Sequence, residues 1–341
     1  MEKIALAGLL PEEIAAAAGF SQKFRGVQIF KWIGSGATDF SQMTDLSKAV
    51  REELSQKAVV RSSSVSKILT DPDGTVKLQV ALRGGGAVET VLLTDKDGRK
   101  TACVSCQVGC GMRCAFCMTG RLGFQRNLEA AEIVEQFLFL EQEAGQLDNI
   151  VFMGMGEPLL NLPAVRKAVS ILTDARGRAL SARRITVSTS GIVRGIYDLA
   201  EHGPHVRLAV SLTSADEALR SELMPVSRDN PLPELRKAVA RYAEQTGRRV
   251  TLEAALLGGR NTGEDAAEKM AEFACGLDVH INVIPWNPVD GLPFSEPSPA
   301  EIRSFMRALE RRGLNVSLRT RRGRKIGGAC GQLGKTLVPA K

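Results

Sequence analysis

The sequence has little histidine and no long apolar segment, and both shortages exclude a class of protein. The chain has three histidines among 341 residues, which argues against a histidine-rich metal site; they are His202, His205 and His280. No uninterrupted apolar run approaches the roughly 18 residues that a membrane-spanning helix requires, so we expect no association with a membrane. Apolar residues make up 44% and aromatic residues 5% of the chain, which is ordinary for a soluble globular protein.

The beginning of the chain lacks the features of an export signal. The apolar part of residues 1–7 is short, and Glu12 and Glu13 follow soon after it. Seven cysteines, an odd number in a long chain without such a signal, indicate a reducing compartment. We therefore expect a cytoplasmic protein.

The formal charge of +7 is unevenly distributed. Residues 319–325 read Arg-Thr-Arg-Arg-Gly-Arg-Lys and stand just before Cys330. Such a cluster can contact phosphate groups, although a charge run taken alone is more often a solvated surface loop.

The chain changes character after residue 58 and again after residue 100. Residues 1–58 predict a small helical unit, in which Pro11 and the acids behind it are typical of a helix start. Residues 59–100 contain short β segments instead. Asp71-Pro-Asp-Gly74 is a turn signal between two of them, which predicts a hairpin, and residues 88–93 form the following strand.

Beyond residue 100, strand-like and helix-like segments alternate six times. The expected strands are 101–105, 149–153, 184–189, 206–212, 249–257 and 280–285. Asn230 before Pro231 predicts one capped helix start, and the capping box Ser298-Pro-Ala-Glu301 predicts another. Alternation of this kind indicates parallel strands with right-handed helical crossovers, which close fully or partly into a barrel.

Polar and glycine-containing motifs follow the expected strands. They are residues 154–157 after the second strand, 188–191 at the third, 211–213 at the fourth and 286–288 after the sixth. Active sites of such barrels lie at the C-terminal ends of the strands, so we expect one functional site at that edge.

The loop after the first of these strands carries Cys110, Cys114 and Cys117 within eight residues. Thiolates so close together repel one another, and a bound metal or iron–sulfur cluster removes that cost. A cluster held by three cysteines leaves one iron open for a substrate or cofactor. A structural zinc closed by a distant fourth ligand, or buried or redox cysteines without metal, are the alternatives.

The spacing C-x3-C-x2-C, with Phe116 before the last cysteine, resembles the signature of the radical S-adenosylmethionine (SAM) enzymes. Further motifs are similar to those of the RlmN/Cfr family of RNA adenosine methyltransferases, and more to RlmN; they are residues 107–110, 123–128 and 153–161. The resemblance runs over nearly the whole chain, from residues 24–32 to 329–333.

This resemblance implies the architecture and the cofactors. We expect an α/β fold with a partial (β/α)6 radical SAM barrel in residues 101–335, an RNA-contacting helical domain in 1–58 and a β-hairpin extension in 59–100. The cofactors implied are a [4Fe–4S] cluster on the three cysteines and SAM, of which two molecules are used per turnover. The residues that match SAM contacts are Gly156, Glu157, Ser188, Ser211, Leu212, Thr213 and Asn287.

The resemblance also implies a reaction and its catalytic residues. It predicts methylation of carbon 2 of an adenosine in the peptidyl-transferase centre of 23S ribosomal RNA, and of the adenosine beside the tRNA anticodon. Cys330 matches the methyl-accepting cysteine and Cys103 the cysteine that resolves the adduct through a transient disulfide. Glu89 lies early on the strand 88–93, where an isolated acid is usually on the solvent face, but it matches the family's proposed proton acceptor. A flavodoxin or ferredoxin is the expected electron donor.

Three positions depart from the family's pattern. Cys106 stands where a small polar residue is expected, and a spectator role is the preferred interpretation. Thr213 replaces a histidine, and the spacing between Glu89 and Cys103 is one residue longer than expected. Cys275, in an apolar helix, is expected to be a core cysteine.

Two other functions remain as alternatives. The first is methylation of carbon 8 of the same adenosine, as in Cfr, because pocket shape decides between the two carbons. The second is a non-enzymatic RNA-binding protein whose cysteines hold zinc. Metal content and a visible spectrum separate the second alternative, since zinc is colourless whereas an iron–sulfur cluster absorbs visible light.

Overall fold

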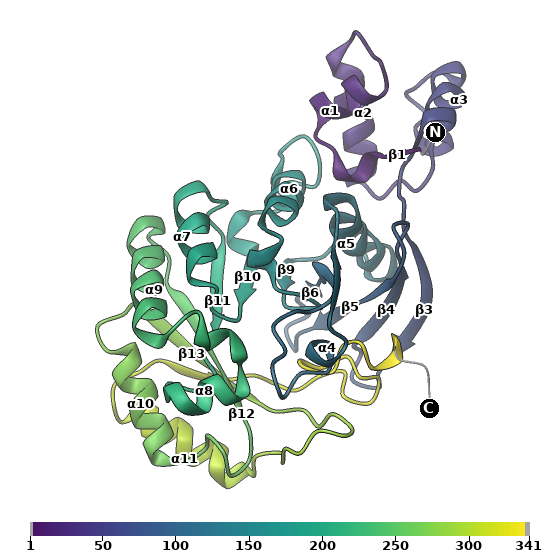
Figure 1. The fold of residues 1–341 in the computed structure, drawn as a ribbon. Coiled ribbons are helices and arrows are strands. Elements are labelled where there is room, and N and C mark those ends of the chain that lie inside the picture. Colours follow the sequence, from purple (N-terminus) through teal and green to yellow (C-terminus); the bar gives the residue numbers. More distant parts are fainter. Residues whose placement is uncertain (1–2, 338–341) are drawn as a thin grey trace.

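A ten-stranded mixed sheet forms the centre of the protein, for which the computed structural model describes residues 3–337 (Figure 1). Its strand order is β14-β13-β12-β11-β10-β9-β6-β5-β4-β3. Seven neighbouring strands run parallel: β6 (Lys100–Cys103), β9 (Asn149–Phe152), β10 (Ile185–Thr189), β11 (Arg207–Ser211), β12 (Val250–Leu256), β13 (Val279–Pro285) and β14 (Val316–Leu318). The six strands expected from the sequence are present. The seventh, β14, has only three residues and too little pattern to predict.

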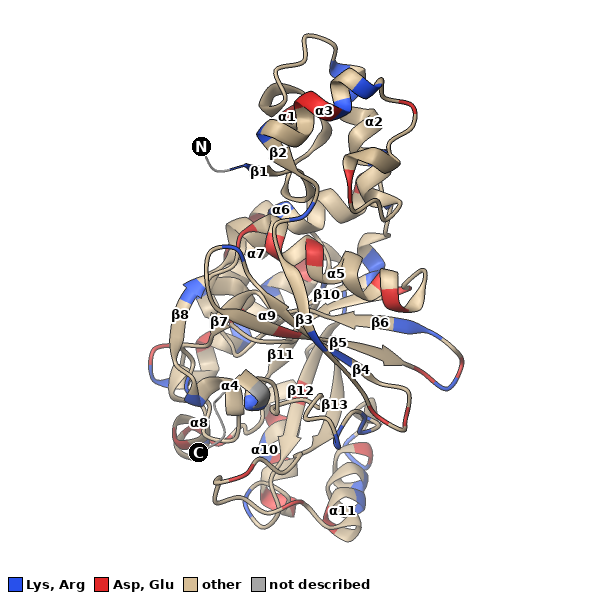
Figure 2. Cartoon of the chain, turned by 90° about the vertical axis from the view of Figure 1, so that its right-hand side faces the viewer, with Lys and Arg blue, Asp and Glu red and all other residues tan. Residues whose placement is uncertain are grey.

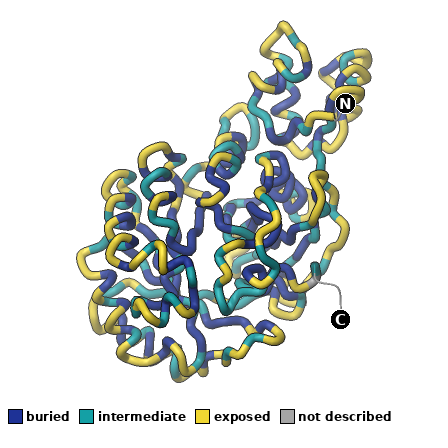
Figure 3. The backbone as a smooth tube through the Cα atoms, viewed as in Figure 1, coloured by how far each residue is buried: buried dark blue, intermediate teal, exposed yellow. Residues whose placement is uncertain are grey.

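Helices join the parallel strands and cover the sheet. They are α5 (Ala130–Ala144), α6 (Leu162–Thr173), α7 (Val193–His202), α8 (Glu217–Leu223), α9 (Leu232–Thr246), α10 (Glu264–Ala274) and α11 (Pro299–Glu310). Buried residues concentrate in the strands and on the inner sides of these helices (Figure 3). Within residues 3–337 no pairing joins β14 to β3, so the sheet is an open, partial barrel. In the same part of the chain, no helix has the length and apolar character needed to cross a membrane.

The β extension continues the sheet of the core. Strands β3 (Ser64–Thr70), β4 (Val76–Ala81) and β5 (Ala87–Thr94) are antiparallel, and β5 pairs antiparallel with β6. The predicted hairpin turn is confirmed: the Asp71 amide donates to the Thr75 carbonyl at 2.8 Å, and Gly74 has a φ of +84°. Glycine adopts this left-handed conformation without steric cost.

The first residues form a helical unit on one side of the molecule (Figure 1). It contains α1 (Pro11–Ala17), α2 (Lys23–Gly34) and α3 (Lys48–Lys57), with the short strands β1 (Ile4–Ala5) and β2 (Ala58–Val59) paired parallel. Pro11 opens α1, as predicted. The unit packs tightly on the core, since a Cβ at Gly8 would lie 2.8 Å from the Cβ of Ala131 in α5.

One predicted helix start is confirmed and one is wrong. Ser298 and Glu301 form the predicted capping box of α11. Asn230, however, does not cap α9, which begins at Leu232. Its side-chain oxygen instead accepts a hydrogen bond at 2.8 Å from the amide of Val193, the first residue of α7. Asn230 therefore ties two helices together.

The expectation of a core cysteine at position 275 is also wrong. Helix α10 ends at Ala274, and Cys275 is exposed because it lies in the turn after the helix.

Candidate active site

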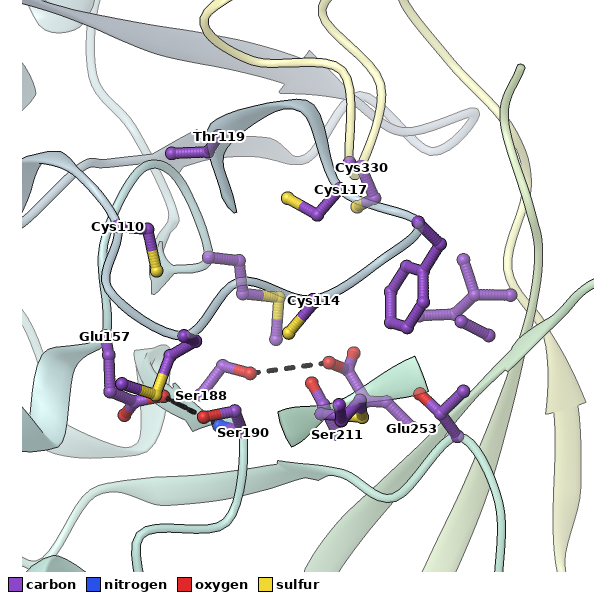
Figure 4. Close-up of a pocket in the computed structure, with 18 of the residues that line it drawn as sticks. Cys110, Cys114, Cys117, Thr119, Glu157, Ser188, Ser190, Ser211, Glu253 and Cys330 are labelled. Atoms are coloured by element: carbon purple, nitrogen blue, oxygen red, sulfur yellow. Dashed lines mark hydrogen bonds between the residues drawn. The ribbon is translucent and has the colours of Figure 1, made fainter. Parts of the chain in front are cut away.

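A cavity lies at the C-terminal ends of the parallel strands, where the sequence motifs predicted it. Its lining includes nearly all of the predicted cluster and SAM residues: Cys110, Cys114, Cys117, Gly156, Glu157, Ser188, Ser211, Thr213, Asn287 and Cys330 (Figure 4). Leu212 is the exception, because its side chain is buried in the core beneath the cavity.

The three neighbouring cysteines are held by the loop between β7 (Gln107–Gly109) and α4 (Met118–Arg121). β7 pairs antiparallel with β8 (Phe124–Asn127). The Cys110 amide donates to the Gly123 carbonyl at 3.0 Å. A side chain at Gly109 is excluded, because its Cβ would lie 1.7 Å from the Gly123 carbonyl oxygen. The other end of the loop is anchored by the Met118 amide, which donates to Gly331 at 2.8 Å.

The three thiols are electrically neutral before they bind a metal. Burial raises the pKa of Cys110 to about 12, and it also raises the pKa of Cys114 and Cys117. The neighbouring thiolates add to the effect at Cys110 and Cys114. Within the described residues, no three His, Cys, Asp or Glu side chains are already gathered as metal ligands. Metal binding to these cysteines would release the protons of their thiols.

A buried carboxylate forms one wall of the cavity. Glu157 is 2% exposed, and one of its oxygens accepts hydrogen bonds of 2.7 Å from the amide and the hydroxyl of Ser190. Burial raises the pKa of Glu157, whereas these hydrogen bonds lower it. Beside it, Gly156 has a φ of +104°, and a Cβ there would lie 2.6 Å from Gln107. This wall fits a ligand with an ammonium group, since a buried carboxylate favours a cationic partner.

The cavity also presents polar atoms that have no partner in the protein. The side-chain amide oxygen of Asn287 and the hydroxyl oxygen of Thr213 are buried, and neither atom forms a hydrogen bond. Because unpaired buried polar groups are costly, both atoms fit a polar ligand in the cavity.

Sequence reasoning missed an ion pair at the centre of the site. Glu253 on β12 lies 3.4 Å from the Arg319 guanidinium and 3.4 Å from the Ser188 hydroxyl. The available signal for Glu253 was an acid in the predicted strand 249–257 between the apolar residues Leu252 and Ala254. Arg319 belongs to the basic run, and its position inside the cavity depends on long-range packing.

Two of the cysteines outside the cluster loop, Cys103 and Cys330, meet at a second cavity. Cys103 and Cys330 both line it, and Cys330 also lines the first cavity. The two cavities share Met153, Ile284, Asn287, Arg319 and Cys330. Burial, and then the nearby Cys330 thiolate, raise the pKa of Cys103 to about 12. Cys330 therefore stands between the cluster cysteines and Cys103, although 227 positions separate it from Cys103 in sequence.

Comparisons with known proteins agree with this arrangement. The family model "Radical SAM superfamily" matches residues 104–274, and "Ribosomal RNA large subunit methyltransferase N-terminal domain" matches residues 17–60. The chain is 58% identical over 334 residues to the probable dual-specificity RNA methyltransferase RlmN of Treponema denticola, covering 98% of this chain and 96% of that protein. It is 46% identical over 344 residues to the protein of the same name from Moorella thermoacetica, covering 97% of each chain. The chain belongs to the RlmN family.

A solved structure supports the same membership. A radical SAM methyltransferase from Sphaerobacter thermophilus superposes with a TM-score of 0.93 at 42% identity, covering 97% of this chain and 99% of that one. RlmN-family membership implies a [4Fe–4S] cluster and SAM. The residues present fit both, through three cysteines from one loop, a buried carboxylate and two unpaired polar atoms in one cavity.

Glu89 lies outside both cavities of this RlmN-family protein. It is fully buried rather than on the solvent face that its strand position indicated, and it forms an ion pair of 3.0 Å with Lys77. Its other oxygen accepts a hydrogen bond of 2.7 Å from the Gly334 amide, and Lys77 donates to the Gly327 carbonyl at 3.2 Å. The buried pair thus holds both sides of the loop that carries Cys330.

The hairpin turn at residues 71–74 also anchors the loop that carries Cys330, through two further hydrogen bonds. The Asp71 carboxylate accepts a hydrogen bond of 2.9 Å from the Lys325 amide, and Asp73 accepts one of 2.8 Å from the Gly323 amide. The β extension is therefore a platform for the Cys330 loop.

Replacing Lys77 with Met is expected to destabilise the protein by about 3–5 kcal/mol, because it removes the cation that lies 3.0 Å from the buried Glu89 carboxylate. Urea unfolding measures the change. Lys57→Met is the control, since Lys57 pairs with Glu53 on the surface and should cost less than about 1 kcal/mol. Equal stability of the two variants would contradict a charged, buried Lys77–Glu89 pair.

The basic run at 319–325 is largely neutralised by carboxylates. Arg322 pairs with Asp95 at 3.3 Å, and Arg321 and Arg324 both pair with Glu296. Lys and Arg are interspersed with Asp and Glu elsewhere on the fold (Figure 2). The run is thus neither a free basic patch nor a simple solvated loop, and phosphate contact by its four paired arginines would require these ion pairs to open.

Cys106 is buried and lines neither cavity, which agrees with a spectator role. Its carbonyl accepts a hydrogen bond of 2.8 Å from the Asn161 side chain, so its backbone supports the cluster loop.

Proposed function

We propose that this protein methylates carbon 2 of an adenosine in 23S ribosomal RNA and of the adenosine beside the anticodon in tRNA. The observation that carries the proposal is the position of Cys330, which lines both the cavity of the cluster cysteines and the cavity of Cys103. The names of the relatives, dual-specificity RNA methyltransferases, support RNA as the substrate. Cytoplasmic action and reduction by a flavodoxin or ferredoxin belong to the same proposal.

In this proposal SAM binds in the first cavity, and the residue that releases the RNA lines the second cavity. Glu157, Ser188, Ser211, Thr213 and Asn287 orient SAM, with Glu157 accepting a hydrogen bond from its amino group. When bound, the cluster supplies the electron that cleaves SAM into a radical able to activate a carbon centre that polar methyl transfer does not reach. Cys330 accepts a methyl group from SAM on its sulfur and carries that carbon to the adenine ring.

Cys103 completes the reaction. Its thiolate attacks the sulfur of Cys330, and a Cys103–Cys330 disulfide forms. The electron pair of the broken sulfur–carbon bond leaves with the transferred carbon, which takes up a proton to become the methyl group, and the disulfide must be reduced before the next turnover. Glu89 remains our candidate for the proton acceptor, but it is ion-paired with Lys77 and lies outside both cavities, so the proposal depends least on it. Burial raises the pKa of Cys103, and the nearby Arg319 charge only partly opposes this effect.

The helical unit is our candidate for an RNA contact. Phe24 on α2 is 56% exposed, and the guanidinium of Arg25 lies 5.5 Å from the centre of its ring. An exposed aromatic ring beside an arginine suits stacking on unpaired bases. This placement supports our division into an accessory domain at 1–58, a β extension at 59–100 and a catalytic core at 101–335.

Mass mapping of modified nucleotides tests the proposed position. Ribosomal RNA and tRNA from cells with and without the protein are digested, and the methyl group is assigned to a ring carbon. We expect methylation of carbon 2 that depends on the protein. A methyl group on carbon 8 would instead identify a Cfr-like activity.

The release of RNA from Cys330 should accelerate with pH. Because burial raises the pKa of Cys103 to about 12, Cys103 is a thiol at neutral pH. Its thiolate fraction, and the release rate in a single turnover, should rise roughly tenfold per pH unit between pH 7 and 9. Rapid-quench measurement of the adduct gives the rate. A release rate that does not change over this range would contradict attack by Cys103.

A further inference from the structure

Arg220 on α8 is a buried cation without an acidic partner. Its side chain is fully buried, and no described carboxylate lies within ion-pair distance of it. Glu217, the nearest acid on the same helix, accepts its hydrogen bonds from Ser227 and Leu232 instead. A buried charge without compensation is strongly unfavourable, so such a residue calls for a reason.

The guanidinium lies directly behind the wall of the first cavity. It donates hydrogen bonds to the Ser190 carbonyl at 2.7 Å, to the Ser211 carbonyl at 2.9 Å and to the Leu212 carbonyl, at the ends of β10 and β11. The side chains of Ser190 and Ser211 line the cavity, whereas Arg220 itself does not. Its Nε has no hydrogen-bond partner. Three neutral carbonyls disperse the positive charge but do not cancel it.

Helix α8 also contacts the cluster loop directly. The Ala115 amide, next to Cys114, donates to the Leu223 carbonyl at the end of α8 at 2.8 Å. Leu223 and Met224 pack in one apolar cluster with Cys114, and Met224 lies 3.4 Å from the guanidinium. This environment contains little polar material to screen a charge. Burial lowers the pKa of Arg220 to about 10, so it is a cation at neutral pH.

We propose that Arg220 is the buried counter-charge of the iron–sulfur cluster. A cluster held by three thiolates is an anion, and its negative charge grows when it accepts an electron. A cation behind Cys114 stabilises the reduced form more than the oxidised form and so raises the reduction potential. Arg220 is a positioning residue for electron transfer, since it touches neither SAM nor RNA. The inference rests on the cluster that the family implies, and not on the proposed position of methylation.

The test compares Arg220→Gln with Arg220→Lys. Both variants lose the guanidinium and its set of hydrogen bonds to the three carbonyl groups. They differ in charge, because lysine is a cation and glutamine is neutral. The midpoint potential of the reconstituted enzyme is measured without RNA by a redox titration followed by electron paramagnetic resonance. We expect the equilibrium constant for reduction of the cluster to be at least tenfold smaller in the Gln variant than in the Lys variant. For one electron this corresponds to a midpoint potential that is at least 59 mV lower.

A matched control lies near the N-terminal ends of the strands, away from the site. Arg178 is partly buried, pairs with Glu141 at 2.7 Å and donates to Leu147 just before β9 begins. Arg178→Gln should leave the potential unchanged. Equal potentials in Arg220→Gln and Arg220→Lys would overturn the proposal, because they would leave Arg220 only the task of holding strand ends.

A second neutral variant covers the case in which Arg220→Gln does not fold. Arg220→Met places an apolar side chain beside Leu223 and Met224, and apolar replacement of a buried charge is often tolerated. Its potential should match that expected for Gln. A cluster that assembles in the Lys variant but in neither neutral variant supports the same role. Failure of the Lys and neutral variants alike to hold a cluster would contradict it.

Discussion

Replacing Cys103 with Ala should convert this enzyme into one that becomes covalently attached to its RNA. The Cys330 thiol remains in the first cavity, where it can accept a methyl group and bond to the adenine ring. The thiol of Cys103 is then missing from the second cavity, and apart from Cys330 itself no described cysteine lines that cavity. The Cys330–carbon bond cannot be broken by thiol attack, so we expect turnover to stop after a single adduct.

Denaturing gel electrophoresis with labelled RNA measures this adduct. It should accumulate in Cys103→Ala and be absent from Cys330→Ala and from the double variant. Cys106→Ala is the matched control, because Cys106 is also buried and close in sequence but lines neither cavity. It should turn over normally. A Cys103→Ala enzyme that releases methylated RNA at the usual rate would remove Cys103 from the mechanism.

Replacing any one of Cys110, Cys114 and Cys117 with Ala should abolish the cluster and all SAM cleavage. A two-cysteine loop cannot satisfy the ligand needs of a cluster, and the described lining of the first cavity contains no histidine that could substitute. Cys330 also lines this cavity, but in our proposal it is the methyl acceptor. Cys106 faces the interior behind the loop, so we expect no rescue by it.

Iron and sulfide analysis with a visible spectrum after anaerobic reconstitution measures this loss. Wild-type protein should bind iron and sulfide and absorb visible light, and each cysteine variant should be colourless. Cys275→Ala is the control, because Cys275 is exposed in the turn after α10. A Cys110→Ala protein with a stable cluster would show that Cys106 serves as a ligand. One zinc and no iron in the wild-type protein would instead indicate a structural metal site.

Features that depend on neighbouring residues could be predicted from the sequence. The Ser298 capping box and the turn that begins at Asp71 are fixed by contacts within four positions, and both are present. The gathering of motifs at one edge also follows from the alternation of strands and helices, since parallel strands place their C-terminal ends together. This is why nearly every predicted SAM residue lines one cavity.

Features that depend on distant packing could not be predicted. The hydrogen bond between Glu89 and Gly334 joins residues 245 positions apart, so an acid that a strand pattern places at the surface is buried. Similarly, Arg319 belongs to the basic run, but its side chain pairs with Glu253 inside the site. Arg220 carries no motif, and its role becomes visible only from its burial and its missing partner.

The direct test of this account is to locate the methyl group on the protein. Purified enzyme is incubated with SAM carrying a labelled methyl group, digested, and analysed by peptide mass spectrometry. Cys330 stands between the two cavities, so we predict a single labelled S-methylcysteine at this position and none in Cys330→Ala. Label on Cys103, or methylation of RNA by an enzyme without label on Cys330, would contradict the account.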